Sequence, residues 1–472
     1  MQIGFEILTK EASPSAFYDY GHQFDVPRCH ENTRVAVLEK IDDWVDLAIE
    51  ITAFIMWLYG AAGAGKSAIA RTMAEKLQIR QQLLATFFFS RADSSRNTIK
   101  SVVATLAYNI ALSVPESRLL IVATIENDPH ILNRPFFHQL EQLILRPLHQ
   151  LSQRGAVYPT VIVIDGLDEC LNHEERMVLL DAISRASVRH SAALKFLITS
   201  RPEVPIARVF NATPVGEVSA RHSLDDEPHS VEDVEYFLSA KFDEIKRTHP
   251  SRRHIPHDWP SSQVTADLVQ QSSGQFIYPA TVIRYILSPR HSPMLRLDMI
   301  LKVQPLLGES PFAQLDTLYR YILLSCEDVE LALRIIGMCL LSTKALDVPW
   351  SRWPFPSSLI APNNMDKILG LHPGDVQRGL EDLGSLIEYK ADDIPLRVLH
   401  ASLFDFLSDP TRFSCLPFNL AAIYTDLAIW SSYLDASHNN VHIRNRNLNT
   451  DASESDILCR PFLSWESPLK LC

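Results

Sequence analysis

Short apolar runs and amphipathic segments alternate along the first half of the chain. Four of the runs, at 54–59, 84–90, 160–165 and 194–199, have the length of strands and are apolar almost throughout. A strand that is apolar on both faces is typical of a parallel sheet with helices on each side. Apolar residues at helical spacing precede the first run and fill much of 94–152. The alternation predicts a doubly wound, parallel α/β sheet.

The strand pattern fades after about residue 215. A helical spacing replaces it, and a second helical region covers 267–287. The apolar residues at helical spacing in the first of these two regions are Val231, Val234, Leu238, Phe242 and Ile245. This pattern predicts a helical domain after the sheet.

Residues 311–409 show a third kind of pattern. Helices expected at 314–325 and 329–342 precede two short strand candidates, at 385–390 and 396–400, and another helix follows them. Helices followed by a small hairpin suggest a winged-helix-like module. In the remaining tail we expect a helix at 418–434 and then a polar stretch.

A complete phosphate-binding loop (P-loop) follows the first predicted strand. The sequence GAAGAGKS fits the pattern G-x-x-x-x-G-K-S, and a helical segment comes directly after it. Small residues let backbone N–H groups wrap a phosphate closely, and the start of the helix adds a positive dipole end. Lys66 would reach the β- and γ-phosphates of a nucleotide, and the Ser67 hydroxyl would bind Mg²⁺. The residues expected to bind nucleotide here are Gly60, Ala61, Ala62, Gly63, Ala64, Gly65, Lys66 and Ser67.

The third predicted strand ends in a cluster of carboxylates. It delivers Asp165 to the edge of the sheet where open α/β sheets bind ligands, and there Asp165 would hold Mg²⁺ together with Ser67. Asp168 and Glu169 follow closely and are candidates to orient or deprotonate an attacking water. The alternative for these two residues is a structural one, in which they place negative charge at a helix N-terminus.

Two basic residues complete the candidate site. Arg201 comes just after the fourth predicted strand, where it would sense a γ-phosphate, contact the acidic cluster or form a plain salt bridge. His400 ends the second hairpin strand, and its imidazole would donate to a diphosphate or serve as a structural histidine. The assigned catalytic residues are therefore Asp168, Glu169 and Arg201.

Together, the patterns and motifs define the expected fold class. It is α/β, a P-loop NTPase parallel sheet with helices on both faces, followed by a helical domain and a winged-helix-like domain. The expected parts are an N-terminal extension (1–34), the P-loop NTPase core (35–215), the helical domain (216–310), the winged-helix-like domain (311–409) and a C-terminal tail (410–472).

Composition narrows the class of protein further. The 472 residues are 46% hydrophobic and 21% charged, as in folded soluble proteins. The formal net charge of −12 would repel phosphate backbones, so no nucleic-acid partner is expected. A short basic cluster at 246–253 is either a solvated loop or a local patch.

The cysteines and the lengths of the apolar runs indicate the cellular location that we expect for the protein. The seven cysteines are scattered and form no CxxC pair, which argues against a disulfide framework and a zinc site. The apolar runs fall short of the roughly 20 residues that span a bilayer. The first residues do not have the pattern of a secretory signal. We therefore expect a soluble cytoplasmic protein without a membrane span.

Three segments together resemble a NACHT NTPase of the STAND class of signalling ATPases. They are GAAGAGKSAIA, VIVIDGLDEC and LITSRPE. The resemblance is closest to fungal, mushroom-type NACHT proteins and runs from about residue 28 to 412. It extends to CHENTRVAVLEKIDDWV, SSGQFIYPATVIRYI and VLHASLFDFLSD.

The resemblance implies a nucleotide switch. In this family ADP holds the helical and winged-helix domains closed over the core, and exchange for ATP opens them and permits oligomerisation. A histidine before an F-x-E-F helix contacts the ADP phosphate in animal members, and His400 occupies a similar place, with Asp405 where the animal pattern has Glu. Family members usually carry an N-terminal effector and a C-terminal repeat sensor. Neither is evident here, so we expect a minimal or truncated member.

Three functions remain open at this point. The first is a signalling switch with slow nucleotide hydrolysis and with protein partners or a homo-oligomer on activation. The resemblance would link such a switch to fungal self/non-self recognition or programmed cell death. The second is an interaction scaffold that nucleotide stabilises without turnover, and the third is a metabolic P-loop enzyme such as a small-molecule kinase. No NKxD guanine-specificity motif is present, yet the sequence leaves ATP/ADP and GTP both open.

Overall fold

The computed structural model describes most of the chain up to residue 427. The described residues are 2–20, 27–46, 53–189, 194–212, 214–227, 229–288, 291–302, 313–344, 357–413, 418–419 and 421–427. Much of the expected tail, including the end of the helix predicted at 418–434, lies outside them.

A five-stranded parallel sheet forms the core, in the order β2-β3-β4-β1-β5. The strands are β1 (Ile55–Tyr59), β2 (Leu83–Phe88), β3 (Val161–Asp165), β4 (Lys195–Ser200) and β5 (Ser219–Ser223). The first four confirm the predicted strands within one or two residues. Strand β5 was not predicted, and it extends the sheet to Ser223, beyond residue 215 where the core was expected to end.

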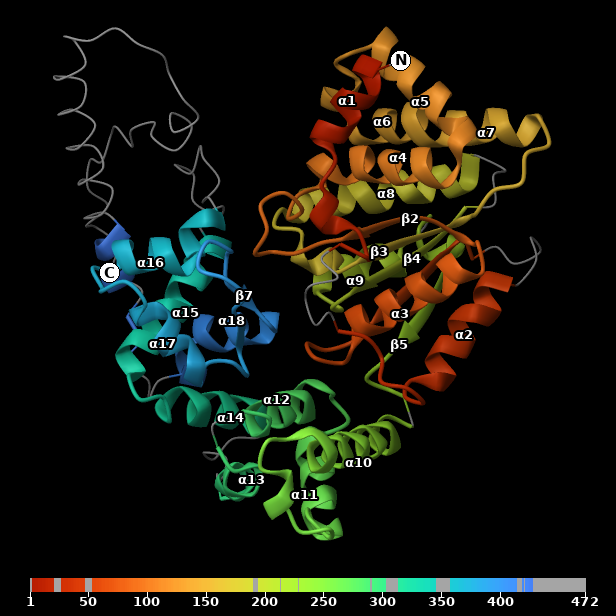
Figure 1. The fold of residues 1–472 in the computed structure, drawn as a ribbon. Coiled ribbons are helices and arrows are strands. Elements are labelled where there is room, and N and C mark those ends of the chain that lie inside the picture. Colours follow the sequence, from red (N-terminus) through yellow and green to blue (C-terminus); the bar gives the residue numbers. More distant parts are fainter. Residues whose placement is uncertain are drawn as a thin grey trace, which may run out of the picture.

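Helices cover both faces of this sheet, as predicted. Side chains alternate along each strand, so Ile162 and Ile164 pack into one apolar cluster while Val161 and Val163 pack into another. In Figure 1, α4 and α8 lie over one face, and α2 and α3 lie over the other. The helices of the core are α2 (Val35–Asp46), α3 (Lys66–Ile79), α4 (Val102–Ser113), α5 (Pro115–Asn127), α6 (Phe136–Leu140), α7 (Arg146–Gln153), α8 (His173–Arg189) and α9 (Val204–Asn211).

The first residues of the chain are part of the core. Helix α1 (Gln2–Glu11) packs against α4 and α5, and Leu8 is fully buried in the same apolar cluster. The approach to α5 is close, because a Cβ on Gly4 would lie 2.8 Å from the carbonyl oxygen of Val122. The segment expected as an extension therefore contributes to the packing of the NTPase core.

A second apolar core holds the rest of the described chain together. It runs from Val234 to Ile423 through helices that the sequence analysis divides between two domains. The elements are α10 (Ser230–Thr248), α11 (Ser262–Ser272), α12 (Ile277–Ile286), α13 (Pro293–Leu301), α14 (Ala313–Leu324), α15 (Val329–Lys344), α16 (Pro362–Ile368), α17 (Asp375–Asp382), β6 (Ile387–Glu388), β7 (Arg397–Val398), α18 (Ala401–Ser408) and α19 (Pro410–Phe413).

The predicted hairpin is present but short. Strands β6 and β7 pair antiparallel over two residues each, and α18 follows directly. Among the described residues, no helix is both long and apolar enough to cross a bilayer.

The parts of the molecule form an arch in Figure 1. The core stands on one side, the helices α10–α13 lie at the bottom, and the elements from α15 to α18 stand on the other side. Helix α18 faces the carboxyl edge of the sheet across the arch, which places the C-terminal elements opposite the P-loop.

The buried side of α1 gives a stability prediction. Leu8→Ala should lower the free energy of unfolding by about 2–4 kcal/mol, because it leaves a cavity in the core. Urea denaturation measures this loss. Ile3→Ala on the same helix is the matched control: Ile3 is 69% exposed, so its truncation should cost no more than about 0.5 kcal/mol. Equal effects of the two variants would show that α1 does not pack on the core.

Candidate functional site

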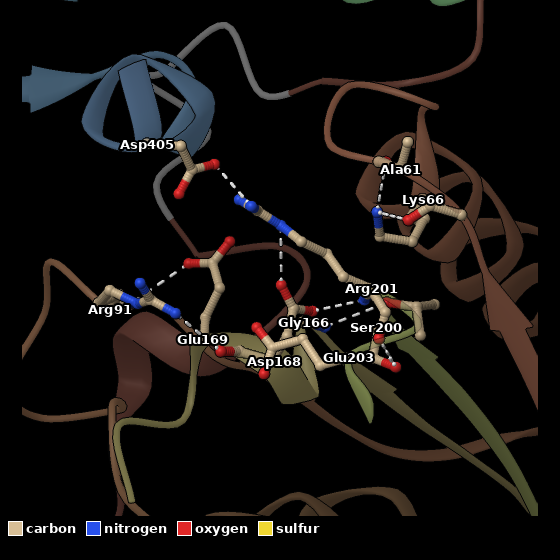
Figure 2. Close-up of polar contacts among 12 residues, drawn as sticks. Ala61, Lys66, Arg91, Gly166, Asp168, Glu169, Ser200, Arg201, Glu203 and Asp405 are labelled. Atoms are coloured by element: carbon tan, nitrogen blue, oxygen red, sulfur yellow. Dashed lines mark hydrogen bonds and ion pairs between the residues drawn. The ribbon is translucent and has the colours of Figure 1, made fainter. Parts of the chain in front are cut away.

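The loops that carry the candidate residues start at one edge of the sheet. Tyr59 at the end of β1 pairs with Ser200 at the end of β4, and Asp165 ends the neighbouring strand β3. The strands are parallel, so the residues after each of them meet at the same edge. This register brings the P-loop, the acidic cluster and Arg201 together, as the sequence analysis expected (Figure 2).

The P-loop is surrounded by close contacts. Gly65 (φ 96°) lies in the left-handed region directly before α3. At Gly63 (φ 83°) a Cβ would lie 2.2 Å from Cγ2 of Ile277, at the start of α12. Lys66 turns back onto the loop, and its Nζ donates to the carbonyl oxygens of Gly60 and Ala61, both at 2.8 Å. The loop therefore makes contacts both with its own lysine and with the helical part of the chain.

Ser67 and Asp165 meet as a magnesium site requires. The buried Asp165 carboxylate accepts hydrogen bonds from the hydroxyls of Thr199 and Ser67. The backbone N–H of Gly166 donates to Thr199 Oγ1 at 3.0 Å, which fixes the threonine in place. Burial raises the pKa of Asp165, and the two hydroxyls work against that rise. A hydroxyl and a carboxylate side by side are ligands that Mg²⁺ prefers, so these residues fit the ion.

Asp168 is paired with Arg201. The backbone N–H of Arg201 donates to Asp168 Oδ1 at 2.9 Å, and its Nε lies 3.1 Å from Oδ2 (Figure 2). The guanidinium then reaches across the arch, where Nη1 lies 2.6 Å from Oδ2 of Asp405 on α18. Both the acidic-cluster contact and the salt bridge proposed for Arg201 are therefore present. The partner on α18 was not predicted.

Glu169 lies beside Asp168 in a single turn of 3₁₀ helix, Leu167–Glu169. Its carboxylate accepts a hydrogen bond from the backbone N–H of Arg91 at 3.1 Å. Burial, and next the charge of Asp168, raise the pKa of Glu169 to about 7. A carboxyl group that titrates near neutral pH is suited to take up a proton from water, which is the role expected for it.

His400 comes from the other side of the arch. It is the residue before α18, and its Nε2 is buried without a hydrogen-bond partner. Burial, and then the positive charges of Arg284 and Arg397, lower the pKa of His400 to about 3, so the imidazole is neutral. A buried nitrogen without a partner, surrounded by positive charge, is suited to an anionic ligand.

Two residues that touch the P-loop were missed by sequence reasoning. Asp225 accepts the backbone N–H of Ala61 with both carboxylate oxygens, at 3.0 Å each. Arg34 donates from Nη2 to the carbonyl oxygen of Ala64 at 3.0 Å. The only signal for Asp225 was its place after β5, and β5 itself was not predicted. Arg34 stands on a left-handed backbone (φ 57°), which no sequence pattern revealed.

A cavity of about 300 Å³ separates the P-loop from the C-terminal elements. The second and third residues of the loop line one side, and α18 lines the other with Ser402 and Asp405. Arg201 and Arg412 also line it. The cavity therefore lies between the phosphate-binding edge of the sheet and the elements that face it.

One family model matches part of the chain. The model described as "Nephrocystin 3, N-terminal" matches residues 36–201, which include the P-loop, the acidic cluster and Arg201. No curated protein matches the chain. The parallel sheet with this loop and this acidic strand is the α/β fold of P-loop NTPases, and the helical region follows it.

Solved structures of low identity resemble the chain over much of its length. The Walker-type ATPase PABY2304 of Pyrococcus abyssi has a TM-score of 0.39 and 13% identity, over 82% of this chain and 99% of that chain. The Aeropyrum pernix ORC1 protein in complex with DNA has a TM-score of 0.34 and 12% identity, over 85% and 96%. Drosophila ORC bound to DNA has a TM-score of 0.28 and 12% identity, over 75% and 81%.

The raised pKa of Glu169 gives a pH-dependent stability prediction. The folded protein holds this proton more tightly than the unfolded chain, whose glutamates titrate near 4.5. The stability that this provides is complete below the lower value and is lost as the pH rises through about 7. At pH 8 Glu169→Gln should therefore be more stable than wild type by on the order of 2–3 kcal/mol.

Urea denaturation of the two proteins between about pH 5 and pH 8 measures this difference. The gap should be small at the acid end and grow with pH. Glu174→Gln, at an exposed position on α8, is the control and should show no such growth. A gap between Glu169→Gln and wild type that stays constant over this range would contradict the assignment.

Proposed function

We propose that this chain is a nucleotide-dependent switch of the NACHT type, within the STAND class, which binds ADP or ATP with Mg²⁺ and hydrolyses ATP slowly. The observation that carries the proposal is the pairing of two parts of the molecule. A complete P-loop and acidic cluster stand on one side of the arch, and Asp405 reaches across to Arg201 from the other side. His400, with its unpartnered buried nitrogen, precedes the same helix.

Nucleotide binding rests on the P-loop. The backbone N–H groups of the loop other than that of Ala61, which donates to Asp225, would form an anion site with the start of α3, and Lys66 supplies a partly buried positive charge. Burial lowers the pKa of Lys66, and the charge of Asp168 opposes that change. Ser67 and Asp165 would hold Mg²⁺, which neutralises phosphate charge when it is bound.

Hydrolysis, in this proposal, uses Glu169 as the base that takes a proton from water. Asp168 positions Arg201, since it holds both the backbone and the guanidinium of that residue. Arg201 is also paired with Asp405, so it is not free to stabilise charge on a phosphate while that pair lasts. This arrangement is consistent with slow turnover.

The C-terminal elements would report which nucleotide is bound. His400 is neutral, so one ring nitrogen carries a proton and the other is an acceptor. An anionic phosphate near His400 would offset the positive charge of Arg284 and Arg397 and favour a protonated imidazole. A diphosphate contact by His400 would then hold α18 against the core. Release of that contact would expose surfaces for protein partners or for a second copy of the chain.

The family resemblance extends the proposal to biological role. We propose a cytoplasmic signalling protein, with fungal self/non-self recognition or programmed cell death as the process it serves. The match to the nephrocystin 3 N-terminal model over 36–201 supports a P-loop core of the same general kind.

The first test of the proposal is Lys66→Ala. Loss of the loop's positive charge should weaken ADP and ATP binding by about a hundredfold or more, since this residue is the main cation of the phosphate site. Isothermal titration with Mg²⁺ measures the affinity. Lys76→Ala on the same helix removes an equal charge from a surface ion pair with Asp42 and is the control, with binding unchanged. A nucleotide affinity of Lys66→Ala equal to that of wild type would contradict the proposal.

The second test concerns His400. His400→Gln should weaken ADP binding by about tenfold, which is the effect of one hydrogen bond to a charged group. His372→Gln, at an exposed position in the C-terminal elements, should leave affinity unchanged. If the two variants bind ADP equally well, His400 is a structural histidine and not a nucleotide contact.

A third measurement separates the switch from the scaffold alternative. Wild type should release phosphate from ATP slowly but measurably, and Glu169→Gln should reduce that rate by about a hundredfold. Equal rates at background level in both proteins would favour a scaffold that binds nucleotide without turnover.

A further inference from the structure

The loop after β2 lies against the turn that carries the acidic cluster. We call this loop, residues 89–98, the β2 loop, and the turn Leu167–Glu169 the acidic turn. Arg91 joins the two: its backbone N–H donates to Glu169 Oε2 at 3.1 Å, and its Nη2 donates to the carbonyl oxygen of Asp168 at 3.1 Å. Figure 2 shows Arg91 beside both residues. The position of Glu169 is therefore tied to the conformation of the β2 loop.

One carboxylate organises the β2 loop. Asp93 Oδ1 accepts the backbone N–H of Ser95 at 3.0 Å and the hydroxyl of the same serine at 2.7 Å. Asp93 Oδ2 accepts Nε of Arg96 at 2.8 Å. Arg96 closes the base of the loop, because its carbonyl oxygen accepts the N–H of Ser90 at 3.2 Å and its Nη1 donates to the carbonyl oxygen of the last β2 residue at 3.0 Å. Arg91 lies inside the loop that these bonds close.

The N-terminal segment reaches the same carboxylate. Ser15 Oγ donates to Asp93 Oδ2 at 2.8 Å, and the hydroxyl oxygens of Ser13 and Ser95 lie 2.8 Å apart. Ser13 is anchored in turn, because its backbone N–H donates to Thr105 Oγ1 on α4 at 2.9 Å. The segment after α1 thus joins the β2 loop to the packed core.

We propose that Asp93 is a positioning residue for Glu169, because its carboxylate keeps the β2 loop in the conformation that presents the Arg91 N–H to the Glu169 carboxylate. The inference rests on the proposed function and deepens it, since it names the residue that sets the state of the general base. The Asp93 carboxylate bonds to the loop and to Ser15, so Asp93 acts on Glu169 through the loop.

The Arg91 hydrogen bond affects how readily Glu169 ionises. A hydrogen bond donated to a carboxylate stabilises the charged form and lowers its pKa. Burial, and next the charge of Asp168, raise the pKa of Glu169 to about 7, and the Arg91 N–H works against that rise. The other charged groups near Glu169 come from the core and from β7, and they are Asp165, Arg201 and Arg397. Loss of the Asp93 carboxylate would release the Arg91 hydrogen bond and raise the pKa of Glu169 further.

The test is the pH dependence of ATP hydrolysis by the full chain, in wild type and in Asp93→Ala. The rate should rise with pH as Glu169 loses its proton, and in Asp93→Ala the midpoint of that rise should lie about one pH unit higher, the effect of one hydrogen bond. At the midpoint of wild type, Asp93→Ala should therefore be about fivefold slower, and well above both midpoints the two rates should agree. The affinities for ATP and ADP should be unchanged.

Two further variants sharpen the comparison. Asp93→Asn keeps an oxygen that can accept the Ser95 N–H but loses the negative charge, so its midpoint should lie between those of wild type and Asp93→Ala. Asp128→Ala is the matched control, because Asp128 organises another loop of the core: its carboxylate accepts the N–H of His130 at 3.1 Å and lies 3.3 Å from Nε of Arg134. This control should keep the midpoint of wild type.

Stability gives a second readout that needs no hydrolysis. The gap in the free energy of unfolding between Glu169→Gln and its parent grows with pH until Glu169 is ionised in the folded protein. In the wild-type background this growth should level off near pH 7. In the Asp93→Ala background it should continue for about one pH unit more. Urea denaturation of the four proteins between about pH 5 and pH 9 measures both gaps.

The outcomes separate this inference from the proposed function. Wild type that hydrolyses no ATP at any pH would contradict the proposed turnover, and the two stability gaps would then decide the role of Asp93. A midpoint and a stability gap in Asp93→Ala that both match wild type would overturn that role and leave the switch standing. A rate lowered by the same factor at every pH would also overturn it, since that is the effect of a purely structural residue.

A variant that does not fold leaves the test intact. If Asp93→Ala does not fold, Asp93→Asn and Ser15→Ala each remove part of the network around the same carboxylate. Both should then raise the midpoint by less than one full hydrogen bond would, and an unchanged midpoint in both would overturn the inference.

Discussion

Negative charge gathered at one edge of the sheet is the constraint on which the rest of this structure depends. Asp165, Asp168 and Glu169 follow one another at the end of β3, and all three lie in or near the protein interior. Burying carboxylates is costly unless each is paired, hydrogen-bonded or protonated. Each of the three carboxyl groups is stabilised in a different way. Asp165 accepts hydroxyl hydrogen bonds, Asp168 is paired with Arg201, and Glu169 has a pKa near neutral.

The arginine that is paired with Asp168 also contacts a residue outside the core. A guanidinium can serve two carboxylates at once, and Arg201 uses its second face for Asp405. Electrostatic balance at the sheet edge is therefore linked to the position of α18. The P-loop is linked to the helical part in a different way, through steric contact between Gly63 and Ile277. One link is an apolar contact, and the other is an ion pair for which an anion could compete. That difference favours the C-terminal elements as the part that responds to nucleotide.

Local patterns in the sequence predicted the core well. The four buried strands are apolar on both faces, and the P-loop and the acidic cluster are short continuous motifs, so each could be read without knowledge of the fold. Strand β5 was missed because its sequence, SARHS, is polar and lies at the edge of the sheet, where burial is incomplete. Helix α1 was missed because a segment rich in aromatic residues and turn formers surrounds it.

Those local patterns could not predict contacts between segments that lie far apart in the sequence. Arg201 and Asp405 are 204 residues apart, and their pairing depends on how the two apolar cores are oriented. Arg34 and Asp225 reach the P-loop from segments that carry no motif. From its place at a strand end, the sequence could name His400 only as a candidate beside a structural alternative, and the family resemblance strengthened the candidate role. Its unpartnered nitrogen and the two arginines around it became visible in the folded structure.

The central claim is that the closed molecule holds a nucleoside diphosphate. The most direct measurement is to purify the chain without added nucleotide, denature it, and identify what is released by chromatography. The account predicts ADP in near-stoichiometric amount. No released nucleotide, and no binding when Mg-ATP is then added to the native protein, would contradict it and show that the P-loop is vestigial.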